Sequence, residues 1–116
     1  MSAAKLYNLD YLKELAAGDN TFMLEMINYF VANSPQVLEQ MDTLVKNKDW
    51  AMLREVIHKF TPNMNLIGLK SAINEANNLE ILAENRKDPD KIPVLVGFIR
   101  EKVEIVIAQL KEDFDI

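Results

Sequence analysis

Apolar residues recur every three or four positions along most of the chain, which is the spacing of an amphipathic α-helix. This pattern divides the sequence into five segments with short polar connections and no internal repeat. The first segment is short, with Asn8 placed to cap it and Gly18 placed to end it. Its predicted apolar face consists of Leu9, Leu12, Leu15 and Ala16.

The second segment is predicted to begin at Asp19 or Asn20 and to run to about Lys46. Its apolar face keeps one helical phase through Met23, Ile27, Phe30, Ser34, Val37, Met41 and Leu44. This phase continues across Pro35, although an interior proline removes one backbone hydrogen bond and crowds the preceding turn. We therefore predict one helix kinked near residues 31–34, and the alternative is a true break at Pro35.

The third and fourth segments are separated by Gly68, which is predicted to end the third helix. Asp49 is placed to cap the third helix, and Arg86 and Lys87 are predicted to lie in the last turn of the fourth, where they suit the negative helix end. The third stripe contains Leu53, Ile57, Phe60, Met64 and Ile67. The fourth contains Leu69, Ala72, Ile73, Ala76, Leu79, Leu82 and Ala83.

The fifth segment has the most regular apolar pattern of the chain. Asp88 is predicted to cap it, with Pro89 in the first turn. Its stripe consists of Ile92, Val96, Ile99, Val103, Val106 and Leu110, broadened by Leu95 and Ile107. Four long helices with short connections predict an all-α fold, namely an antiparallel four-helix bundle that forms one domain over residues 1–116, with the short first helix across one end.

Composition supports a helical chain and excludes several classes of function. Three glycines and four prolines in 116 residues are few for an all-β protein, which needs turn residues about every 8–12 positions. The absence of cysteine excludes thiolate zinc sites, catalytic cysteines and disulfides. No apolar run approaches the roughly 18 residues of a membrane-spanning helix. A net charge of −5 lacks the basic footprint of nucleic-acid binding. No apolar signal core follows the N-terminus, so we expect a cytoplasmic location.

Acidic residues occur mostly at outward-facing helical positions. The pairs Glu80 and Glu84, and Glu101 and Glu104, are interpreted as solvated surface rather than acid/base machinery. No Gly-rich phosphate loop is present. We therefore expect no autonomous enzymatic activity, no metal site and no cofactor.

His58 is the single histidine and the strongest candidate for chemistry. At about 100° per residue, its side chain points about 140° away from the centre of the third stripe, so we expect it to face water. Arg54, Thr61 and Asn65 lie on the same outward arc, and Lys59 is adjacent. An exposed imidazole among cationic and hydrogen-bonding side chains is a competent nucleophile towards an activated phosphoryl group.

The stretch 57–69, with the sequence IHKFTPNMNLIGL, resembles the phosphorylation motif of histidine-containing phosphotransfer (HPt) domains. Matching positions in this stretch are His58, Lys59, Phe60, Ile67, Gly68 and Leu69. In the next segment, Ala76, Leu79, Glu80 and Ala83 approximate a second pattern of the family. HPt domains are four-helix bundles with a short N-terminal helix, so the resemblance extends over nearly the whole chain.

Two positions depart from the HPt pattern. Thr61 stands where the family commonly has a second lysine, and Pro62 stands where it has glycine. Thr61 leaves Lys59 and Arg54 to meet the phosphate charge. Pro62 is bulkier beside the imidazole but lacks an N–H, which frees the carbonyl of His58. Transfer is therefore expected to be slower or more dependent on the partner than in a Lys-Gly version.

The resemblance implies a phosphoryl carrier of a two-component phosphorelay. His58 would accept a phosphoryl group from a receiver-domain aspartate and pass it to a second receiver, with Lys59 stabilising the phosphate. The expected partners are receiver domains of response regulators and hybrid histidine kinases, which supply the Mg²⁺, and the carrier is expected to be a monomer that binds neither nucleic acid nor membrane. The expected docking surface comprises Ala51, Arg54, Glu55, Thr61, Pro62, Asn65, Leu66 and Gly68.

Leu66 is expected to face outward, either as a partner contact or as an ordinary exposed leucine. Two alternatives to the carrier remain. One is an adaptor that binds receivers or other proteins through the same face without being phosphorylated, with Thr61 and Pro62 marking lost chemistry. The other is a purely structural helical bundle.

Overall fold

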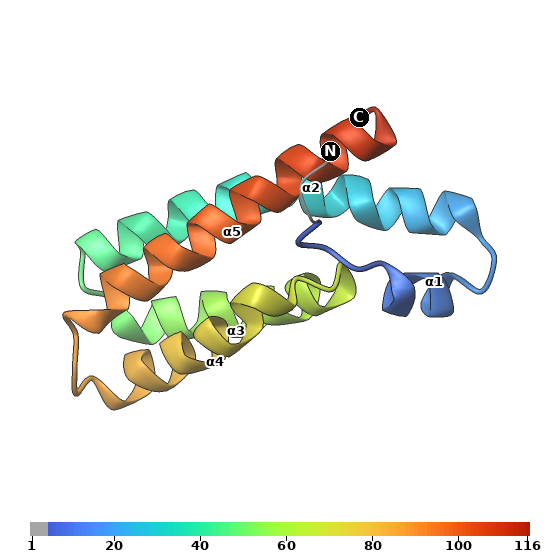
Figure 1. Ribbon diagram of the computed structural model, residues 1–116. Helices are drawn as coiled ribbons and strands as arrows, with labels where there is room; N and C mark the ends of the chain where they lie inside the picture. The colour runs from blue at the N-terminus through green and yellow to red at the C-terminus, as the bar shows by residue number, and fades with distance from the viewer. Residues whose placement is uncertain (1–4) are drawn as a thin grey trace.

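The computed structural model describes residues 5–116, and this part of the chain forms five helices and no strand (Figure 1). The prediction of an all-helical chain is thus confirmed, and the arrangement is compatible with a helical bundle. The helices are α1 (Asp10–Ala16), α2 (Asn20–Lys46), α3 (Trp50–Leu66), α4 (Lys70–Asn85) and α5 (Lys91–Phe114). Within the described range, no helix combines the length and apolar character needed to cross a membrane.

The four long helices contact one another in a closed cycle, in which α2 packs on α3, α3 on α4, α4 on α5, and α5 on α2. Figure 1 shows α2 alongside α5 and α3 alongside α4. The connections between them are short and span residues 47–49, 67–69 and 86–90. The short helix α1 contacts the start of the chain's longest helix, α2.

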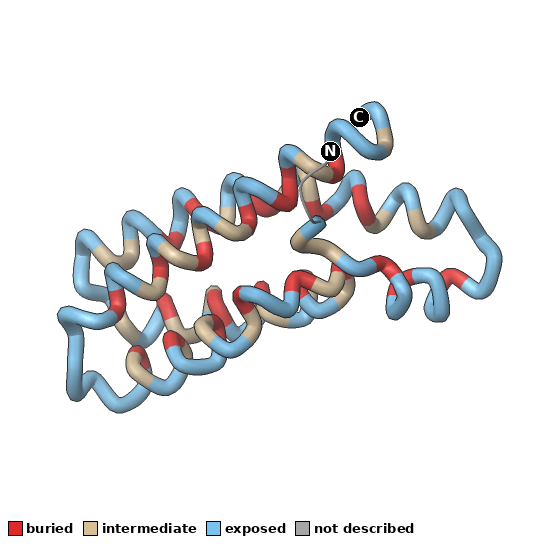
Figure 2. The backbone as a smooth tube through the Cα atoms, viewed as in Figure 1, coloured by how far each residue is buried: buried red, intermediate tan, exposed pale blue. Residues whose placement is uncertain are grey.

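The core is built from the apolar stripes predicted by the helical periodicity. All five residues of the predicted third stripe are buried, as are most members of the other stripes, and Figure 2 shows the buried positions in red along the helices. Leu15 is the clearest exception, because half of its surface is exposed although it was predicted to belong to the apolar face of α1. A helix as short as α1 rests on Leu12 and Ala16 alone, so Leu15 has no neighbouring layer to contact.

The helix starts were predicted well where a side-chain cap forms. The carboxylates of Asp19 and Asp49 accept hydrogen bonds from the backbone N–H groups of Phe22 and Met52, as expected of N-caps. Asn8 is not the N-cap of α1, because the helix begins one residue later than expected, with Leu9 at the N-cap. The Asn8 side chain still accepts a hydrogen bond from the N–H of Asp10 at 2.9 Å.

The boundary between α4 and α5 differs from the prediction. Helix α4 ends at Asn85, and Arg86 forms its C-cap in the left-handed conformation with φ 58°, so Arg86 and Lys87 lie beyond the last turn. Asp88 and Pro89 belong to a turn that precedes α5, in which their carbonyls accept from the N–H groups of Lys91 and Ile92. The predicted start at Asp88 and Pro89 is therefore wrong by two residues.

Helix α2 is continuous through Pro35, so the alternative of a true break is wrong. An interior proline costs about 3 kcal/mol. Phe30 before it and Leu38 after it are each only 2% exposed, and a large apolar side chain contributes about 1.5–3 kcal/mol on burial. Burial therefore outweighs the cost of the proline and keeps both halves in one helical phase.

The N-terminal segment, residues 5–9, ties α5 to the turn between α3 and α4. The Leu6 N–H donates to Oε1 of Gln109 at 2.9 Å, and the Asn8 N–H donates to the carbonyl of Ile67 at 2.9 Å. At the same end, Lys5 and the Tyr7 hydroxyl both bond to the carboxylate of Asp113. Burial and then the contact with Asp113 raise the pKa of Tyr7 to about 12, while the Tyr7 hydroxyl and Lys5 lower the pKa of Asp113.

The Tyr7 and Asp113 contact predicts a loss of stability in acid. Because the pKa of Asp113 is lowered by folding, its contribution is present above the usual aspartate pKa of about 4 and disappears as the pH falls through the lowered value. In urea unfolding, Tyr7→Phe is expected to be less stable than the wild type at neutral pH, and the difference should shrink below about pH 4. A difference that does not change with pH would contradict a charge-assisted bond between these residues.

Candidate functional site

The orientation of His58 follows from how α3 is anchored. The Asp49 cap fixes where the helix begins, and the buried residues Ile57 and Phe60 fix which face points inward. His58 lies between them in sequence and is therefore turned outward, with 62% of its side chain exposed. The prediction that His58 faces water is confirmed.

Glu80 on α4 is the direct partner of His58. Its Oε1 atom lies 2.8 Å from Nδ1 of the imidazole, and its side chain is only 21% exposed. Glu80 is therefore less solvated than expected, while Glu84, with 62% of its side chain exposed, lies at the surface as predicted. The sequence does contain a signal for this contact: His58 and Glu80 each lie eleven residues from Leu69, in the turn that joins the two helices. Two helices joined by a tight turn fold back along each other, which places such residues at the same level.

The contact with Glu80 determines which ring nitrogen is available. An ionised carboxylate only accepts hydrogen bonds, so Nδ1 must carry the proton in this contact. The hydrogen bond made by one imidazole nitrogen sets the state of the other. In the neutral ring, Nε2 then keeps its lone pair and is the ring atom that can act as a nucleophile.

Arg54 lies on the α4 side of His58 and is surrounded by carboxylates. Its guanidinium nitrogens lie 3.0 Å from Oε1 of Glu55, 3.7 Å from Oε1 of Glu80 and 3.7 Å from Oε2 of Glu84. Its Nε is shielded from solvent and makes no hydrogen bond, because the Glu84 contact is an ion pair at longer range. Arg54 is thus held against α4, whereas the sequence alone suggested a cation available for phosphate.

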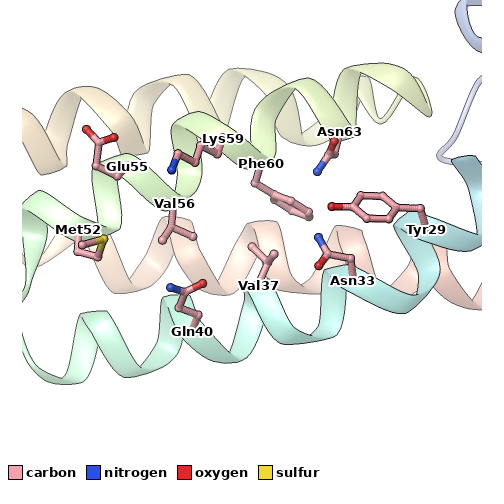
Figure 3. Close-up of a pocket in the computed structure, with 10 residues that line it drawn as sticks. All are labelled: Tyr29, Asn33, Val37, Gln40, Met52, Glu55, Val56, Lys59, Phe60 and Asn63. Carbon is pink, nitrogen blue, oxygen red and sulfur yellow. The ribbon is translucent and has the colours of Figure 1, made fainter.

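Lys59 lies on the other side of His58, at a groove between α2 and α3 (Figure 3). The groove has a volume of about 350 Å³ and carries amide side chains from both helices. Tyr29 and Asn63 lie at one end of it, and Met52 and Glu55 lie at the other. Lys59 makes no ion pair within residues 5–116, so its charge is available to an incoming group.

The two residues that depart from the HPt pattern are accommodated within α3. The Thr61 hydroxyl donates to the carbonyl of Ile57 at 2.8 Å, so this donor is already occupied. Pro62 is exposed and does not interrupt the helix. Asn65, one turn further on, is exposed as expected. Leu66 differs from the expectation of an outward leucine, because it is half-buried and packs against the core.

Gly68 has a structural reason to be glycine. Its φ is +65°, and an added Cβ would lie 2.2 Å from the carbonyl oxygen of Asn8. The N-terminal segment therefore approaches the turn after α3 closely only because residue 68 has no side chain. Its role as a predicted partner contact stays a prediction.

The spacing Glu55-x-x-His58 is the one used by di-metal carboxylate bundles, which require two such motifs and further glutamates. Here His58 is the only histidine, and Glu55 is paired with Arg54. Among the described residues, no group of three or more His, Asp or Glu side chains is placed to hold a metal ion.

His58 thus stands on a ridge of α3, with the Glu80 and Arg54 cluster on one side and the Lys59 groove on the other. This arrangement presents an exposed imidazole held through Nδ1, together with Lys59, which has no ion-pair partner among residues 5–116. Comparison of the chain with protein-family models, with curated proteins and with solved structures gives no match.

Proposed function

We propose that this protein is a histidine phosphotransfer carrier that takes a phosphoryl group from a receiver-domain aspartate onto His58 and passes it to another receiver. The observation that carries the proposal is the exposed imidazole whose Nδ1 is held by Glu80 at 2.8 Å. An imidazole that is exposed and also held by a hydrogen bond is both accessible to a partner and restrained in orientation. The resemblance of residues 57–69 to the HPt motif supports the same assignment.

The proposed transfer balances without moving a proton. The lone pair of Nε2 attacks the phosphorus of the aspartyl phosphate, an N–P bond forms, and the P–O bond breaks with its electron pair returning to the aspartate carboxylate. The ring then carries a positive charge, with the proton still on Nδ1 and facing the Glu80 carboxylate. Transfer to the second receiver is the reverse reaction, in which Nε2 recovers its lone pair.

The carrier is proposed to have no autonomous catalysis and no cofactor of its own. The receiver would supply the Mg²⁺ and acidic residues that neutralise the transferring group. Lys59 would supply the nearby positive charge from the carrier side. The docking surface would extend from the exposed face of α3, including Pro62 and Asn65, to the groove beside α2.

We propose that the long helices form an antiparallel four-helix bundle with α1 across one end, supported by the closed cycle of helix contacts and the short connections. We expect such a carrier to be a cytoplasmic monomer. Its partners would be the receiver domains of response regulators and hybrid kinases, with which it would exchange phosphate.

The proposal is tested by mixing the purified protein with a panel of receiver domains charged by a small phosphodonor. Acid-labile, base-stable label on this chain is the expected result. Binding to receivers without label would overturn the carrier and favour the adaptor. Neither binding nor label across the panel would leave the structural bundle as the better description.

Lys59→Ala is expected to slow phosphotransfer by about tenfold to 150-fold, because a charge-assisted contact to phosphate contributes about 1.5–3 kcal/mol. Urea unfolding should be nearly unchanged, since Lys59 is exposed. Lys87→Ala is the matched control, because it removes the same charge from the exposed connection between α4 and α5. Equal transfer rates for the wild type and Lys59→Ala would remove the proposed role of Lys59.

A further inference from the structure

We propose that Arg54 is a positioning residue for His58, which acts by holding Glu80 in place. The inference rests on the proposed function for its effect on phosphotransfer. The proposed effect of Arg54 on which ring nitrogen of His58 carries the proton can be measured without any partner protein.

The contacts form a chain from Arg54 to the imidazole. Oε1 of Glu80 accepts from Nδ1 of His58 at 2.8 Å, and the same oxygen lies 3.7 Å from Nη2 of Arg54. One carboxylate oxygen therefore faces both the histidine and the guanidinium. The Arg54 side chain is 33% exposed, so this ion pair is partly shielded from solvent.

Arg54 is needed to hold Glu80 beside His58 because Glu84 repels Glu80. Glu80 and Glu84 are four residues apart on α4, and like charges at this spacing repel each other. Arg54 lies 3.7 Å from a carboxylate oxygen of each, on the side where they face α3. Its guanidinium thus offsets the repulsion and fixes a glutamate side chain that would otherwise rotate freely in water.

Loss of Arg54 is expected to change the tautomer of His58. Without the guanidinium, the Glu80 carboxylate is pushed away by Glu84 and turns towards water, so Nδ1–H loses its acceptor. The imidazole then also populates the form with the proton on Nε2. That form has no lone pair on Nε2 and cannot attack phosphorus there.

The tautomer population of His58 can be measured directly, because His58 is the only histidine of the chain. In protein labelled with ¹⁵N in the imidazole ring, all side-chain imidazole resonances come from His58. At a pH where the ring is neutral, we expect the wild type to show a predominantly protonated Nδ1 and an unprotonated Nε2. Arg54→Gln should shift the population towards protonated Nε2, and Arg54→Lys, which keeps the charge but not the planar fork, should shift it less.

Two further variants separate positioning from general stability. Arg100→Gln is the matched control, because Arg100 is 34% exposed, pairs with Asp42 on α2 and Glu104 on α5, and makes no contact with His58. It should lose stability without changing the tautomer of His58. The double variant Arg54→Gln/Glu84→Gln removes the repulsion as well as the cation, so it should recover part of the wild-type tautomer population.

Phosphotransfer provides the second readout. Arg54→Gln should lower the transfer rate by about tenfold, the lower end of what is lost when a group that orients a reactive side chain is removed. Arg54→Lys should lose less, and Arg100→Gln should transfer at the wild-type rate. An unchanged tautomer in Arg54→Gln would overturn the inference. A shifted tautomer in a protein that accepts no phosphate would overturn the proposed function and leave the positioning role of Arg54 intact.

Discussion

His58→Gln is expected to abolish phosphorylation of this chain by charged receivers. His58 is the only histidine, and the amide nitrogen of glutamine is not nucleophilic, so no N–P bond can form at this position. Glutamine can still donate to Glu80, so the network on α4 keeps a partner. The side chain is 62% exposed, and the free energy of unfolding should therefore change by less than about 1 kcal/mol. Acid-labile label on the chain, together with urea unfolding, measures both effects.

The control for this experiment is Arg100→Gln, which alters the surface between α2 and α5 and should keep its label. Label that persists in His58→Gln at the wild-type level would show that the phosphoryl group sits on another residue, and His58 would lose its assignment. Loss of both label and fold would instead indicate a structural role that the exposure of His58 does not suggest.

Gly68→Ala is expected to destabilise the protein by about 1.5–3.5 kcal/mol. A left-handed backbone costs a residue with a Cβ about 1–2 kcal/mol. In addition, the new Cβ would lie 2.2 Å from the Asn8 carbonyl oxygen, so the N-terminal segment must move. This movement breaks the bond from the Asn8 N–H to the Ile67 carbonyl, which contributes a further 0.5–1.5 kcal/mol or so. Urea unfolding followed by circular dichroism measures the sum.

Substitutions at the other two glycines distinguish the cost of a left-handed backbone from the cost of the contact with Asn8. Gly18 has φ +91° but open space around its position, so Gly18→Ala should show the backbone cost alone. Gly97 lies within α5 with no positive φ and no neighbour within 4 Å, so Gly97→Ala should stabilise the protein by about 0.5–1 kcal/mol. Equal effects of Gly68→Ala and Gly18→Ala would contradict the close packing of the N-terminal segment on the turn after α3.

Local patterns predicted the helices because their causes are local. The stripes of α3 and α5 are buried as expected, and the caps at Asp19 and Asp49 form through contacts three residues away. The connection between α4 and α5 was misjudged because its sequence offers competing starts. Asp88 and Pro89 resemble a helix beginning, but their carbonyls close a turn, and α5 begins at Lys91.

The candidate site also combines one feature that was predicted from the sequence with contacts that were not. Helical periodicity was enough to predict that His58 faces outward, because it relates His58 to the buried residues on either side. Three contacts could be known only from the packed fold, namely Glu80 beside Nδ1 of His58, the three carboxylates around Arg54, and Asn8 against Gly68. Periodicity gives the direction of a side chain about its own helix axis. Which side chains meet depends on the relative rotation and level of two helices, which the packing of the whole core sets.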